Sequence, residues 1–148
     1  MIPTDEWSRA MRRSKKRFKV RRGAAAVEFA FVAPVFFLVV LGVIEFTRAM
    51  MVEELLTNAA HEGARAGVLD GAQESDVDNA VNSYLSAAGI SGATTAVSPN
   101  PPCSANYGQS VQVTVTIPYK SVSWLPVPQY LGSATLEAVS LMRRETSN

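Results

Sequence analysis

Residues 29–44 form sixteen consecutive positions without a charged or hydrogen-bonding side chain, and this apolar run limits what the chain can fold into. Residues 24–27 are apolar as well, so only Glu28 interrupts a stretch of twenty-one residues. As a helix rising ~1.5 Å per residue, such a stretch would be roughly 31 Å long, about the thickness of the hydrocarbon core of a bilayer. The sequence therefore predicts a transmembrane helix at residues 24–46.

Two other interpretations of the run fit less well. A cleavable secretory signal has an apolar region of ~7–15 residues and a small-x-small cleavage site, whereas this run is longer and is followed by Glu45, Phe46, Thr47 and Arg48. A buried helix of a soluble domain is disfavoured by the basic block that precedes the run.

Charge is strongly segregated along the chain. Residues 1–23 contain nine Lys and Arg against two acidic residues, a net charge of +7, whereas residues 24–148 contain five basic and eleven acidic residues, a net charge of −6. Because Lys and Arg resist translocation, we expect residues 1–23 to be a cytoplasmic leader and residues 70–148 to be extracytoplasmic. A basic cluster can also bind nucleic acid, but beside an apolar span it is more simply a topology signal, and we expect no nucleic-acid partner.

The composition argues against an enzyme. The chain has one His and one Cys, which excludes most metal sites and any disulfide within the chain. This count leaves very little for nucleophilic catalysis, because a Cys–His pair would need both residues. We expect no catalytic residue, no metal and no cofactor. Cys103 lies in a Pro-rich loop, where we favour a free thiol over a bond to another chain.

Glu28 is the most informative single residue, because a carboxylate inside a spanning helix costs ~2–3 kcal/mol or more to insert. One interpretation places it at headgroup depth, where it is solvated. The other uses Gly23, five residues earlier: a cut between Gly23 and Ala24 would create an ammonium group, which the Glu28 carboxylate of an adjacent copy could pair with. Pro34 removes one backbone hydrogen bond from the span and predicts a kink or a loosened turn.

The segment RRGAAAVEF, followed by the long apolar run, resembles a type IV prepilin processing site. More of the chain resembles the TadE-like proteins of tight-adherence (Tad) pili, strongly over residues 22–69 and more weakly over residues 133–145. The shared positions after Gly23 are Glu28 and Phe29, then Glu45, Phe46 and Arg48, then Asn58, Glu62, Gly63 and Arg65. His61 departs from the pattern, which more often has Arg there.

The resemblance implies a minor pilin or pseudopilin that assembles or anchors an adhesive Tad pilus, in the inner membrane or in the pilus itself. It also implies processing after Gly23 by a prepilin peptidase, and contacts with other Tad pilins or pseudopilins, the assembly platform and the bilayer. The residues themselves leave open an uncleaved, single-pass, membrane-anchored binding module.

The remaining pattern predicts an α+β, type IV pilin-like fold. Apolar and small residues at steps of three and four continue the helix to residue 69, so residues 47–69 would extend it outside the membrane. Residues 70–148 would form a small α+β domain, with an amphipathic helix that starts at a Ser75–Asp78 capping box and stops at Gly89. Alternation predicts antiparallel strands at 94–98, 109–117 and 134–143, and the apolar loop 124–131 would cover a sheet edge or contact a partner or a membrane.

Overall fold

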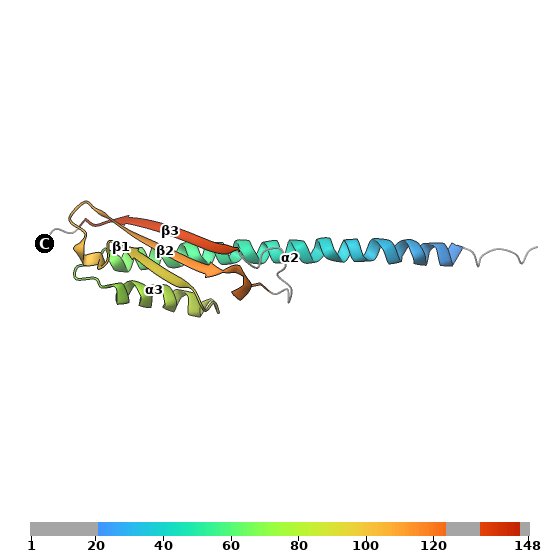
Figure 1. Ribbon diagram of the computed structural model, residues 1–148, viewed down its shortest axis with the longest axis horizontal. Coiled ribbons are helices and arrows are strands. Elements are labelled where there is room, and N and C mark those ends of the chain that lie inside the picture. The colour runs from blue at the N-terminus through green and yellow to red at the C-terminus, as the bar shows by residue number, and fades with distance from the viewer. Residues whose placement is uncertain (1–20, 124–133, 146–148) are drawn as a thin grey trace, which may run out of the picture. The chain divides into compact units, whose positions relative to one another are not determined.

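The computed structural model describes residues 21–123 and 134–145 of the 148-residue chain, and its elements follow the periodicity of the sequence. In chain order they are the helices α2 (Arg21–Gly67) and α3 (Glu74–Ala87), the strand β1 (Thr94–Ser98), the 3-10 turn η1 (Pro102–Ser104), the strand β2 (Ser110–Pro118), the 3-10 turn η2 (Tyr119–Ser121) and the strand β3 (Thr135–Arg143) (Figure 1). The α+β class, with a long apolar helix, a second helix and a three-stranded antiparallel sheet, is confirmed.

The chain divides into two structural units, residues 1–42 and residues 43–148, here called the anchor unit and the body unit. Helix α2 contributes to both. Most of the basic leader (residues 1–20) and the apolar loop at 124–131 lie outside the described residues.

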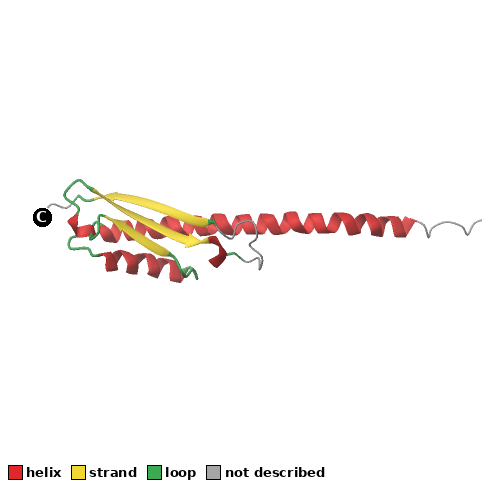
Figure 2. Cartoon of the chain, in the orientation of Figure 1, coloured by secondary structure: helices red, strands yellow, loops and turns green. Residues whose placement is uncertain are grey.

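The body unit is built on a sheet with strand order β1-β2-β3, in which both pairings are antiparallel. Alternate residues of β2 are fully buried, and they are Val111, Val113, Val115 and Ile117. They form one core with the buried residues of α3 and of the body-unit part of α2, so both helices cover the same face of the sheet (Figure 2). The opposite face carries Gln112, Thr114 and Thr116, as expected for an antiparallel sheet with one wet side.

Small residues let α2 approach the rest of the body unit closely. A Cβ atom placed on Gly63 would lie 2.7 Å from Val81 Cγ2 of α3 and 3.2 Å from Val113 Cγ1 of β2. A Cβ on Gly67 would lie 3.1 Å from Val111 Cγ1. Gly63 and Gly67 therefore set the packing distance between α2 and its neighbours α3 and β2.

The N-cap of helix α3 lies two residues before the expected capping box. The N-cap is Gln73, whose extended backbone (φ −110°, ψ 164°) lets its N–H donate to Asp76 Oδ2 at 2.9 Å. The prediction of a Ser75–Asp78 box was therefore wrong: Asp76 supplies the N3 carboxylate of a box with the same spacing. The stop at Gly89 is confirmed, because Gly89 has φ +72° and its N–H bonds to Ser86 O (3.0 Å) while that of Ile90 bonds to Leu85 O (2.9 Å).

Candidate functional site

The anchor-unit part of α2 exposes its apolar side chains on all sides. Phe29, Phe31 and Leu38 each expose more than 70% of their surface. Among the described residues, one helix, Gly23–Gly67, is long and apolar enough to cross a membrane, and none of its most apolar window, with a mean hydropathy of 2.6, is buried. Side chains this apolar and this exposed need a covering that is not water.

Gly23, Ala24 and Glu28 lie in the first turns of α2, and all three are exposed. The peptide bond between Gly23 and Ala24 is inside the helix, which begins at Arg21. A Cβ on Gly23 would meet no atom within 4 Å. The residues that would define a processing site are thus accessible near the first described residues of α2.

Pro34 lies within α2, and the helix runs through it without a break. A kink at this position stays a prediction. One turn further on, the rings of Phe36 and Phe37 meet edge to face, with centroids 5.7 Å apart.

Glu45 is the buried carboxylate of the body unit, with 8% of its surface exposed. It accepts a hydrogen bond of 2.8 Å from the Tyr119 hydroxyl and another from the Ser123 hydroxyl, both at the η2 turn that follows β2. Burial raises the pKa of Tyr119 to about 12, and the hydrogen bond to Glu45 and its negative charge act in the same direction. The carboxylate therefore ties α2 to the end of the central strand.

The other two residues of the Glu-Phe-x-Arg segment point in different directions. Arg48 Nε donates to Val122 O at 3.4 Å, next to the Glu45 contacts, and Arg48 is partly buried. Phe46 has 67% of its surface exposed. The charged ends of this segment thus hold the η2 turn, whereas the phenyl ring faces outward.

The second segment of the resemblance, residues 58–65, also has some residues at the surface and others in the core. Asn58 is exposed, and Glu62 Oε2 forms an exposed salt bridge of 3.0 Å with Arg65 Nη2 one turn away. Gly63 is buried against α3 and β2. His61 is exposed on the helix, and its Nδ1 lies 3.1 Å from the hydroxyl of the buried Ser140 on β3.

Three residues that contribute contacts to this unit were missed by sequence reasoning. Tyr119 and Ser123 give no local signal, because their partner Glu45 is more than seventy residues away. Arg144 is buried, donates from Nη1 to Cys103 O (2.8 Å) and Ala105 O (3.1 Å), and forms a 2.8 Å salt bridge with Asp70. The alternation of β3 could have found Arg144, since it continues the inward-facing positions of that strand.

Among the described residues, no group of three or more His, Cys, Asp or Glu side chains is placed to hold a metal ion. Among the described residues, Cys103 is a free thiol, and Gln73 Nε2 lies 3.6 Å from its sulfur.

Comparison with known proteins adds one finding. No curated protein and no solved structure matches the chain. A family model described as TadE-like protein matches residues 23–65, which include the candidate processing site, the apolar helix and both downstream segments. The resemblance is confirmed over these residues, which are fewer than a third of the chain. Residues 23–65 of this chain are thus similar to the TadE-like family, and the exposed apolar helix within them indicates membrane anchoring.

Proposed function

We propose that this protein is a minor pilin or pseudopilin that takes part in assembling or anchoring a Tad-type adhesive pilus. The observation that carries the proposal is an exposed apolar helix with Glu28 five residues after Gly23, within a segment that matches the TadE-like model. The protein is inserted in the inner membrane with residues 1–23 in the cytoplasm and residues 70–148 outside. A prepilin peptidase then cuts between Gly23 and Ala24.

The chemistry of Glu28 gives the cut a purpose. Processing removes the basic leader and leaves an ammonium group on Ala24, so the mature helix begins with a cation. The Glu28 carboxylate of one copy pairs with the ammonium group of an adjacent pilin or pseudopilin. This pairing offsets the cost of holding either charge beside the apolar span and fixes the axial register of the two helices.

Mass spectrometry of the protein purified from membranes tests the processing step. In cells that contain the peptidase, we expect a mass lower by that of residues 1–23, and the intact mass in cells that lack it. Gly23→Leu should block the cut. Gly42→Leu is the matched control, because a side chain at either glycine meets no atom within 4 Å. An unprocessed protein in the presence of an active peptidase would contradict the proposal.

Substitution of Glu28 tests the pairing. Glu28→Ala should leave the amount of membrane-inserted protein unchanged and strongly reduce the number of surface filaments, counted by electron microscopy. Glu54→Ala, which removes another exposed carboxylate of α2, should reduce neither. Normal filaments with Glu28→Ala would remove the proposed role of this residue.

The second candidate is an uncleaved, membrane-anchored module that binds a ligand or surface outside the membrane. It shares the exposed anchor helix but keeps residues 1–23, so the same mass measurement separates the two functions. Genes for a secretion ATPase and a prepilin peptidase next to the gene of this protein would favour the pilin.

A further inference from the structure

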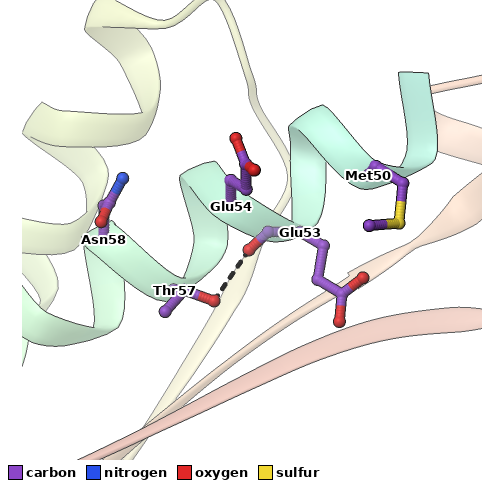
Figure 3. Close-up of a pocket in the computed structure, with 5 residues that line it drawn as sticks. All are labelled: Met50, Glu53, Glu54, Thr57 and Asn58. Atoms are coloured by element: carbon purple, nitrogen blue, oxygen red, sulfur yellow. Dashed lines mark hydrogen bonds between the residues drawn. The ribbon is translucent and has the colours of Figure 1, made fainter. Parts of the chain in front are cut away.

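The outward face of α2 changes its chemistry abruptly inside the body unit. Apart from Thr47, its exposed side chains are first apolar, and we call this group the apolar collar: Val43, Ile44, Phe46, Met50 and Met51. Each exposes between 46% and 67% of its surface. One turn later the same face is polar, with Glu53, Glu54, Thr57 and Asn58, and Figure 3 shows Met50 on the turn next to Glu53 and Glu54. The switch takes place between Met51 and Glu53.

The polar side chains interspersed with the collar are directed into the chain itself. The Glu45 carboxylate accepts hydrogen bonds from Tyr119 and Ser123, and the Thr47 hydroxyl donates to Val43 O at 2.9 Å. Arg48 Nε donates to Val122 O at 3.4 Å. A surface in contact with lipid hydrocarbon requires this arrangement, because a polar group that faces lipid has no water with which to form a hydrogen bond.

We propose that lipid covers the apolar collar, so that the outer boundary of the bilayer's hydrocarbon core, along the outward face of α2, lies at Met51. In the sequence the collar follows directly on the exposed apolar run that begins at Phe29, with no exposed charged residue between Phe29 and Met51, and this continuity selects lipid as the occupant. The inference rests on the membrane anchoring in the proposed function, and it proposes Met51 rather than the expected residue 46 as the outer end of the span.

The shift has a consequence at the other end of the span. A hydrocarbon core of ~30 Å takes ~20 helical residues, so counting back from Met51 places its inner boundary near Val32. Glu28 then lies about one turn outside the hydrocarbon core, at headgroup depth. The precursor inserts without burying that carboxylate, and the peptide bond between Gly23 and Ala24 lies at the cytoplasmic surface.

Site-directed spin labelling of the full chain measures this boundary. The background is Cys103→Ala, and single cysteines replace Phe46, Met50, Glu54 or Thr57, with Phe37 as a lipid reference. The protein is reconstituted in vesicles of phosphatidylethanolamine and phosphatidylglycerol, and the accessibility of each label to oxygen and to a water-soluble nickel chelate is measured. Labels at 46 and 50 should resemble that at 37, with a ratio of oxygen to nickel accessibility at least about tenfold above that at 57.

Each outcome decides a separate point. Labels at 46 and 50 that are as accessible to nickel as that at 57 would overturn the collar, provided that the label at 37 is in lipid. A label at 37 that is accessible to nickel would instead overturn the membrane anchor and with it the proposed function. A third outcome is that labels at 46 and 50 are shielded from both reagents and that their spectra are broadened by spin–spin interaction, which disappears when unlabelled protein is added. This outcome would show that a second copy rather than lipid covers the collar.

Discussion

Glu45 shows how a single residue of a recognisable segment acquires its role through partners that are distant in sequence. Its position after the apolar run can be predicted from the resemblance, but its burial cannot. The Tyr119 hydroxyl that satisfies it comes from a turn formed more than seventy residues later. A buried carboxylate without such donors would cost several kcal/mol, so the packing of η2 on α2 and the burial of Glu45 depend on each other.

The pKa of Tyr119 makes this contact measurable. The folded-state pKa of about 12 lies above the unfolded value of about 10, so folding favours the neutral phenol. This contribution to the free energy of unfolding is complete below about pH 10 and is lost as the pH rises towards 12. Absorbance at 295 nm should show one of the four tyrosines ionising near pH 12, and Tyr119→Phe should remove that step.

At neutral pH, Tyr119→Phe should lower the free energy of unfolding by about 1.5–3 kcal/mol, because a hydrogen bond to a buried carboxylate is lost. Tyr107→Phe is the control: Tyr107 is 67% exposed, and its substitution should leave both stability and the high-pH titration step unchanged. A titration step near pH 12 that survives in Tyr119→Phe would contradict the assignment.

Arg144 holds three backbone segments together, and its loss should be costly. Arg144→Ala leaves the carbonyls of Cys103 and Ala105 without their donor and separates Asp70 from its partner. We expect the free energy of unfolding, measured with denaturant in detergent micelles, to fall by about 2–3 kcal/mol. Arg144→Lys should recover only part of this, since an ammonium group lacks the planar fork of a guanidinium.

The adjacent Arg143 provides the matched control. It is exposed on the other side of β3, so Arg143→Ala should change stability by no more than about 0.5 kcal/mol. Equal effects of the two substitutions would show that the buried contacts of Arg144 do not carry the stability assigned to them.

At the scale of elements, periodicity predicted most of the body unit, because each pattern is local. The alternation of Val111, Val113, Val115 and Ile117 located β2, and the strand at 94–98 has the expected bounds. The start of α3 was misplaced, because Ser is a commoner N-cap than Gln, whereas the contact that decides it is the Asp76 carboxylate on the Gln73 N–H. Side-chain contacts between segments decide such details, and no local pattern contains them.

Gly63 tests the close packing of α2. Gly63→Ala places a Cβ 2.7 Å from Val81 Cγ2, and α3 or α2 must shift to accept it. Alanine favours a helix by about 1 kcal/mol over glycine, but overpacking costs typically 1–3 kcal/mol, so we expect a lower midpoint of thermal unfolding, measured by circular dichroism. The double variant Gly63→Ala/Val81→Ala should recover part of the loss.

Gly42→Ala separates overpacking from helix propensity. Its Cβ would meet no atom within 4 Å, so the substitution should leave the midpoint unchanged or raise it. Equal destabilisation by both glycine substitutions would mean that close packing at Gly63 does not limit the structure.

At the scale of the whole molecule, charge and apolar length together predict how the chain is inserted, and both are sequence properties. The leader carries a net charge of +7 and the rest of the chain −6. The positive-inside rule acts through the basic residues near the span, so the anchor and its orientation can be predicted without any contact. The depth of the span cannot be predicted in this way, because it depends on which polar side chains are buried in the folded body unit.

The orientation is tested by replacing the six basic residues nearest the span with Gln: Lys15, Lys16, Arg17, Lys19, Arg21 and Arg22. Alkaline phosphatase fused after Asn148 is active only outside the cytoplasm, and we expect its activity in the unaltered chain to be at least about tenfold higher than in this variant. Arg9, Arg12 and Arg13 lie farther from the span, so their replacement with Gln should have a smaller effect, because the influence of a charge on topology falls with its distance from the span. Undiminished phosphatase activity in the six-residue variant would show that the body unit is exported for a reason other than leader charge, and the span would then have to be oriented by its own downstream end.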